Sequence, residues 1–146
     1  MNTFMNAFTS SDWTAYPFAS QNQKDFDNLL SVYLDSVFFP NLNELDFAQE
    51  GHRLEFSELH NRKSELVNKG IVFNEMKGAM SSVNSILWQT ITKNLFSNTT
   101  YHFNSGGEPE EIVKLTYEHF KNFHETHYHP SNAIFFTFGD ISAVHH

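Results

Sequence analysis

The residues with the clearest capacity for chemistry are the histidines near the end of the sequence. His124, His127 and His129 lie close together, and the i,i+3 spacing of the first two places them on one helix face, where a metal could bind. The H-E-x-x-H pattern of zinc peptidases needs an i,i+4 pair, which this run lacks. Histidines at a helix C-terminus also interact favourably with the helix dipole. The sequence therefore allows a metal-binding protein built on these histidines, but it favours a structural role for them.

A second candidate is the carboxylate of Glu75, in the run Asn74-Glu75-Met76-Lys77-Gly78. Glu75 and Lys77 do not face each other on a helix, so an ion pair between them does not explain either residue. On spacing alone, the simpler interpretation is a solvated glutamate near a helix N-terminus, stabilised by the dipole. The chain contains no cysteine, so any metal site must use His, Asp or Glu side chains.

The candidates are expected to lie mainly on helices. Apolar residues recur at helical spacing over residues 24–39 and 72–96, and the second stretch is weakened at Gly78 and at Ser81-Ser82, which allows a break there. Thr116 is a good N-cap for a helix that runs to about His127. Residues 41–51 are compatible with a short helix.

The strands are expected at the two ends of the sequence. Alternating residues predict a hairpin over residues 3–9 and 13–18. The apolar run 133–138 predicts a buried strand. The polar stretch 55–69 predicts a solvated loop, and residues 97–109 predict another. Together these elements indicate an α+β fold.

Composition excludes several classes of partner. The formal net charge of −8 argues against binding to nucleic acid or to an anionic membrane. No apolar run is long enough for a spanning helix, and no targeting signal is visible, which favours an intracellular location. The 16 Phe residues predict either a large aromatic core or faces that another part of a protein covers.

Several runs in this order resemble the presequence-protease branch of the pitrilysin/insulinase superfamily of zinc metallopeptidases. They include Asn6-Ala7-Phe8-Thr9 and Asn74-Glu75-Met76-Lys77-Gly78, and the full series covers residues 2–9, 16–18, 24–26, 32–40, 49–55, 69–79, 104–107 and 127–133. The resemblance implies that this chain is part of the family's first domain, an antiparallel sheet with helices packed on it.

The resemblance also implies a chemistry. In this family an H-x-x-E-H helix supplies two zinc-binding histidines and the general base, and the third ligand corresponds to Glu75. The substrate peptide adds as a strand to the edge that corresponds to Asn6, Ala7, Phe8 and Thr9, which suits an enzyme that degrades varied peptides.

The sequence departs from the family in one respect, because no H-x-x-E-H occurs in it. The resemblance places that helix upstream of residue 2. We therefore expect residues 1–146 to be a single incomplete domain that is inactive alone, binds no stoichiometric zinc, and works with the rest of a parent polypeptide on peptide substrates. Self-association through uncovered surface is also expected. The alternative is a non-catalytic α+β module that binds peptides or serves a structural role.

Overall fold

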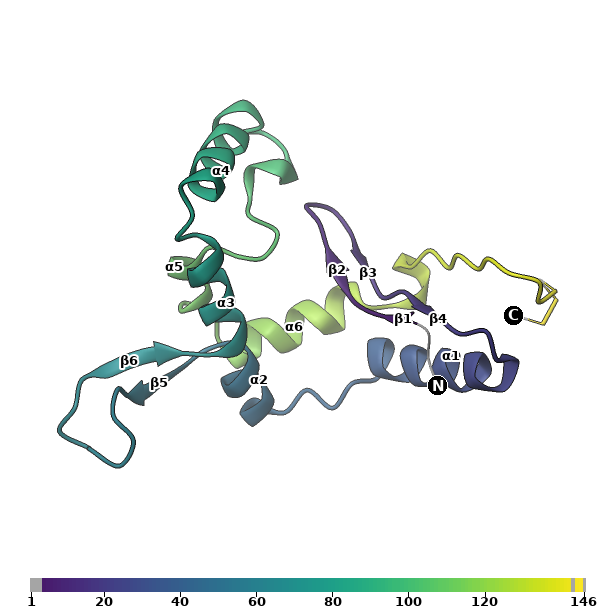
Figure 1. Ribbon diagram of the computed structural model, residues 1–146, viewed down its shortest axis with the longest axis horizontal. Coiled ribbons are helices and arrows are strands. Elements are labelled where there is room, and N and C mark those ends of the chain that lie inside the picture. Colours follow the sequence, from purple (N-terminus) through teal and green to yellow (C-terminus); the bar gives the residue numbers. More distant parts are fainter. Residues whose placement is uncertain (1–3, 143, 146) are drawn as a thin grey trace.

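The computed structural model describes residues 4–142 and 144–145 of the chain. It confirms the α+β class, with short antiparallel strand pairs and separate helices. The molecule is open and branched: a hairpin and a long helix lie on one side, a cluster of helices lies on the other, and two arms project outwards (Figure 1).

The predicted first hairpin is present in the described residues. It consists of β1 (Phe4–Met5), β2 (Phe8–Thr9), β3 (Thr14–Ala15) and β4 (Phe18–Ala19). The register that sets Phe4 opposite Ala19 continues unchanged through β2 and β3, so the four strands form one interrupted ladder. The interruption is at Pro17: Asn6 donates its N–H to the Pro17 carbonyl at 3.1 Å, but Pro17 has no N–H to donate in return. Thr3, the predicted start, lies outside the described residues.

Helix α1 (Gln23–Phe38) packs against this hairpin and confirms the helix predicted over residues 24–39. The Asn22 side chain begins it by accepting the Asp25 N–H at 3.0 Å, which satisfies one of the free donors of the first turn. The ring of Phe18 lies 5.2 Å from that of Phe26 and 4.7 Å from that of Tyr33. Aromatic contacts therefore join the helix to the hairpin.

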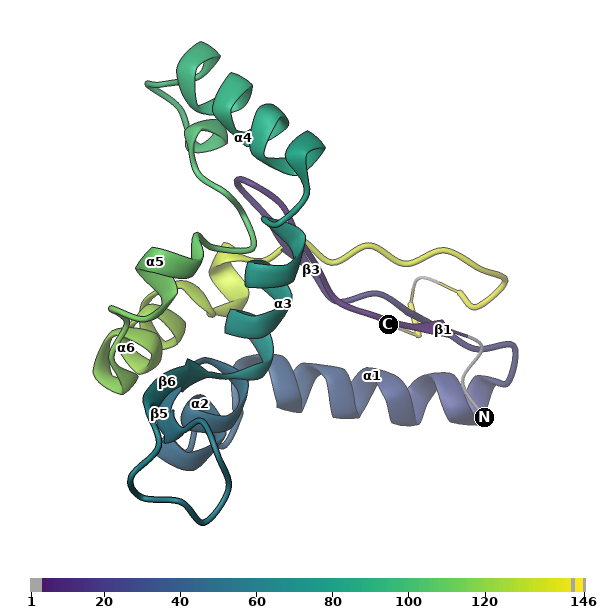
Figure 2. The ribbon, with the colours of Figure 1, turned by 60° about the vertical axis from the view of Figure 1, so that its left-hand side comes forward.

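The second group of elements surrounds a small core. It contains α2 (Glu44–Glu50), α3 (Ile71–Ala79), α5 (Pro109–Ile112) and α6 (Tyr117–His127), so the predicted short helix and the helix capped by Thr116 are both confirmed. Helix α3 contacts both α2 and α5 and stands beside them in Figure 2. Phe73 on α3 and Ile112 on α5 are 8% and 5% exposed, and no other described hydrophobic side chain is as deeply buried.

The predicted loop at residues 55–69 is correct only for its middle, residues 57–65, because strands form at both of its ends. Strands β5 (Arg53–Phe56) and β6 (Leu66–Lys69) pair antiparallel with Arg53 opposite Lys69. The partly buried face carries charge: Glu55 contacts Lys69 on the opposite strand at 3.0 Å and Arg53 on its own strand at 2.6 Å. Glu55 and Lys69, two of the charged residues that suggested a loop, therefore neutralise each other between the strands.

The stretch predicted as one helix over residues 72–96 is broken, as the sequence allowed. Helix α3 ends at Ala79, and α4 (Val83–Leu95) begins after Ser82, whose backbone is extended. Helix α4 then projects away from the body together with the short 3-10 helix Thr100–His102 (Figure 1). Much of its apolar face is uncovered, and Trp88 is 68% exposed.

The predicted buried strand at residues 133–138 is also wrong. After the short 3-10 helix Pro130–Asn132, the chain has no regular secondary structure over these residues, and Ile134 and Phe136 are 98% and 86% exposed. A strand needs a neighbour to satisfy its backbone groups, and no described segment pairs with this run.

The solvent-accessible surface area is large, as expected for an open, branched molecule. The chain exposes 11535 Å², whereas a compact monomer of its 16.9 kDa mass would expose about 7,700 Å². None of the described helices has the length and apolar character that crossing a membrane requires.

Candidate functional site

Glu75 lies on the outer face of α3. Phe73, two residues earlier, points into the core, whereas Glu75 is exposed. Among the described residues, no hydrogen bond or ion pair involves the Glu75 carboxylate. The side chain is therefore free to bind an additional group, which is also true of a solvated surface glutamate.

The edge formed by residues 6–9 is open. In an antiparallel ladder the residues alternate between pairs that exchange hydrogen bonds and pairs whose backbone groups point outwards. Asn6 donates to the opposite strand, so the peptide groups of Ala7 and Thr9 face the outer edge. The Asn6 side-chain oxygen accepts the Ala7 N–H at 2.8 Å, and all four predicted residues, Asn6, Ala7, Phe8 and Thr9, are exposed. A further strand can add here once the Asn6 side chain releases that N–H.

The two predicted site regions are not in contact. The ribbons of α3 and β2 lie apart in Figure 1, so the structure does not place Glu75 against residues 6–9.

The histidine cluster is engaged in packing. The His124 Nε2 donates to the Val37 carbonyl at 2.8 Å, and its ring stacks on Tyr128 with centroids 4.5 Å apart. His127 lies against Phe123, and His129 bonds to Ser131. These contacts support the structural interpretation, but the carbonyl that His124 satisfies belongs to α1 rather than to its own helix. No three described His, Asp or Glu side chains converge as a metal site.

One polar pair was not found from the sequence. The hydroxyls of Tyr16, at the hairpin, and Tyr128, after α6, are 2.8 Å apart. Burial, and then the hydrogen bond to Tyr128, raises the pKa of Tyr16. No local pattern signals a contact between residues so distant in the chain.

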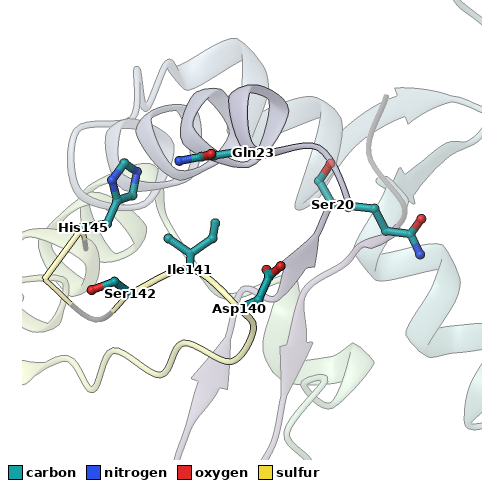
Figure 3. Close-up of a pocket in the computed structure, with 7 residues that line it drawn as sticks. Ser20, Gln23, Asp140, Ile141, Ser142 and His145 are labelled. Atoms are coloured by element: carbon teal, nitrogen blue, oxygen red, sulfur yellow. The ribbon is translucent and has the colours of Figure 1, made fainter.

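Two cavities of about 420 Å³ each lie away from the predicted residues. Figure 3 shows the first, which is open and polar and lies between the start of α1 and residues 140–142 and 145. The second is mainly apolar and lies where Phe47 and Val72 meet the loop at Gly106 and Gly107. Neither cavity contains Glu75 or any of residues 6–9.

The chain is similar in sequence to known peptidases. Residues 114–145 match the family described as Peptidase M16 inactive domain, a range that contains neither Glu75 nor the hairpin edge. Over all 146 residues the chain is 58% identical to the mitochondrial presequence protease of Danio rerio and 54% identical to that of Mus musculus. It is 48% identical over 142 residues, 96% of the chain, to Protein HypA of Clostridium perfringens.

The chain spans 14% of the length of each of these relatives. The similarity runs along the whole chain and includes the residues singled out above. The chain belongs to the presequence-protease branch of the pitrilysin/insulinase superfamily of peptidases.

Proposed function

We propose that this chain is part of a zinc-dependent endopeptidase that degrades unstructured peptides, with Glu75 as one metal ligand. The observation that carries the proposal is the 58% identity to a presequence protease along the whole chain. Within it, Asn74-Glu75-Met76-Lys77-Gly78 places an exposed carboxylate with no described partner on a helix.

The chain fits a zinc ion in part. A carboxylate oxygen is a standard ligand in catalytic zinc sites that hold three protein groups and keep one position open. The described residues supply no cluster of three such groups, so Glu75 would share the metal with ligands from outside these residues. An H-x-x-E-H helix of the parent protein would provide them. When bound, zinc supplies the activation of a water molecule and the polarisation of the scissile carbonyl.

The open hairpin edge supports a role in holding the substrate. Backbone hydrogen bonds from Ala7 and Thr9 would bind an extended peptide without requiring a particular sequence. The Asn6 amide now occupies the Ala7 N–H, so binding would exchange an internal hydrogen bond for one to the peptide. The same edge is the observation that favours the alternative, a non-catalytic peptide-binding module.

Under this proposal, the cellular location of the parent protein is inferred from its relatives. Presequence proteases of vertebrates, yeasts and a fly are named as mitochondrial. We assign the parent of this chain to the mitochondrion, which is more specific than the intracellular location expected from the sequence.

Replacing Glu75 tests the metal assignment. In a chain extended to include the H-x-x-E-H helix, Glu75→Gln should lower zinc content and peptide turnover together, because a neutral amide is a much poorer zinc ligand than a carboxylate. Metal analysis and cleavage of an unstructured fluorogenic peptide measure the two effects.

The control is Glu110→Gln, which alters another exposed helical glutamate and should change neither property. The 146-residue chain alone should show background turnover only. Full zinc and full activity after Glu75→Gln would show that Glu75 is an ordinary surface residue and would leave the non-catalytic module as the better interpretation.

A further inference from the structure

We infer that Gly70, immediately before α3, is a positioning residue for Glu75. Because Gly70 has no side chain, the first turn of α3 can lie directly on the backbone of Gly51, and this contact fixes the place of Glu75. The inference rests on the function proposed above, and it concerns how the fold orients the ligand rather than which residue binds the metal.

The space at Gly70 is closed by backbone atoms. A methyl group added there would overlap the carbonyl oxygen of Gly51 and would lie 2.7 Å from its carbonyl carbon and 2.8 Å from the Cα of His52. Main-chain atoms cannot rotate away as a side chain can. Gly70 has an extended φ of 166°, so the requirement for glycine comes from space and not from an unusual backbone conformation.

A hydrogen bond also stabilises the contact between the start of α3 and the backbone of Gly51. No side chain caps the start of α3, and the first N–H groups of a helix lack partners within it. The Phe73 N–H instead points to the Gly51 carbonyl, with the nitrogen 3.4 Å from the oxygen. Gly51 ends α2, and its own N–H donates to the Phe47 carbonyl at 2.8 Å. The start of α3 is therefore fixed to the end of α2.

This contact controls Glu75 because the two lie on one short helix. Glu75 is little more than one turn beyond Gly70, and a helix transmits a shift of its first turn along its length. Relieving the overlap at Gly70 requires a movement on the order of 1 Å, which is larger than a precisely built metal site tolerates. Gly70→Ala should therefore misplace the Glu75 carboxylate while leaving its chemistry intact.

The test uses cobalt in the extended chain that includes the H-x-x-E-H helix. The visible absorption of bound Co²⁺ reports the number and geometry of its ligands, so it detects a displaced carboxylate independently of activity. Gly70→Ala should weaken Co²⁺ binding about tenfold or more, the usual effect of losing support around a ligand, and should shift the spectrum towards that of Glu75→Gln.

The matched control is Gly106→Ala, the same substitution beside the other end of α3. There the added methyl overlaps the Sδ and Cε of Met76, the end of a flexible side chain that can turn aside, and makes only an ordinary contact with the Asn104 side chain at 3.7 Å. Gly106→Ala should leave the cobalt spectrum unchanged.

The outcomes separate the two proposals. If Glu75→Gln leaves the cobalt spectrum unchanged, the metal assignment fails. If Glu75→Gln alters the spectrum and a folded Gly70→Ala does not, the metal assignment stands and the positioning role is overturned.

If Gly70→Ala does not fold, the positioning role can be tested by hydrogen exchange of the backbone amides in the extended chain without substitutions. Coupling between two sites is reciprocal, so a metal held through Glu75 should slow exchange of the Phe73 N–H at the Gly51 contact. Unchanged exchange on metal binding would overturn the inference.

Discussion

Single polar side chains join distant parts of this open molecule, and several of them do so by satisfying carbonyls near helix ends. His124 donates to the Val37 carbonyl in the last turn of α1 at 2.8 Å. The Tyr117 hydroxyl donates to the Leu42 carbonyl at 2.6 Å, and His52 donates to the Leu115 carbonyl at 2.8 Å. Carbonyls in the last turn of a helix lack partners within it, so the His124 bond satisfies a group of α1 that its own backbone cannot, whereas Leu42 and Leu115 lie in the connections before α2 and α6.

The Tyr16–Tyr128 pair gives a prediction at this scale. The pKa of Tyr16 is raised in the folded chain, so folding favours its neutral form. That contribution to stability is fully present below the unfolded tyrosine pKa of about 10 and is lost as the pH rises above it, because the unfolded chain then releases the proton more readily. Thermal unfolding measured between about pH 9 and pH 11 should show this loss.

Tyr16→Phe removes the titrating group and should flatten that part of the profile, whereas Tyr101→Phe, which alters an exposed tyrosine, should leave it unchanged. An unchanged slope in Tyr16→Phe would contradict the assignment of the alkaline loss to Tyr16.

At the scale of elements, the helices with local signals were predictable. Thr116, which the sequence indicated as an N-cap, caps α6 through a side-chain bond to a nearby N–H group, and Asn22, which was not singled out, does the same for α1. The β5–β6 hairpin was missed because its partly buried face is charged, and the partner of Glu55 across the ladder, Lys69, lies 14 positions away in the sequence. The strand predicted at residues 133–138 does not form for the opposite reason. Its composition suits a buried strand, but pairing depends on a neighbour that the described residues do not provide.

The cap of α6 is open to a direct test. The Thr116 hydroxyl accepts the His119 N–H at 3.2 Å, and Thr116→Ala leaves that donor without its partner. We expect the free energy of unfolding to fall by about 1 kcal/mol, the usual effect of losing such a cap. Urea unfolding followed by circular dichroism measures the change.

Thr116→Ser keeps the hydroxyl and serves as the control, with stability close to that of the parent. Equal stability of the Ala and Ser variants would mean that the cap contributes nothing to α6.

For the whole molecule, the excess of exposed surface is the dominant property. Apolar residues remain uncovered on α4 and along residues 133–138, including Trp88, Ile134 and Phe136. Patches of this kind mark surfaces that contact another protein or another part of the same protein. The chain spans 14% of its relatives, and a parent polypeptide of similar length would supply such cover.

We therefore expect the isolated chain to self-associate. Size-exclusion chromatography with light scattering should show a mass that rises with protein concentration. Replacing Phe136 and Phe138 together by lysine should shift the distribution towards monomer, because charge opposes burial of this run. Leu45→Lys, at another exposed apolar residue, should have little effect. A sharp monomer peak at every concentration would contradict the prediction.

The candidate site was only partly predictable from the residues themselves. Spacing alone favoured a solvated role for Glu75, and the proposal that it is a metal ligand came from family resemblance. The exposed carboxylate is compatible with either role. The part played by Gly70 was not predictable, since it depends on Gly51 of another element approaching the same backbone.

The β5–β6 hairpin has a practical consequence for detecting this segment within a longer polypeptide. Its connecting residues 57–65 are mostly exposed and project from the body, away from both α3 and the first hairpin (Figure 1). Exposed loop tips tolerate insertions, and the entropy of closing a loop rises only slowly with its length. A fluorophore or a short epitope tag carried at this tip would report the location and exposure of the segment without altering Glu75 or the hairpin edge at residues 6–9.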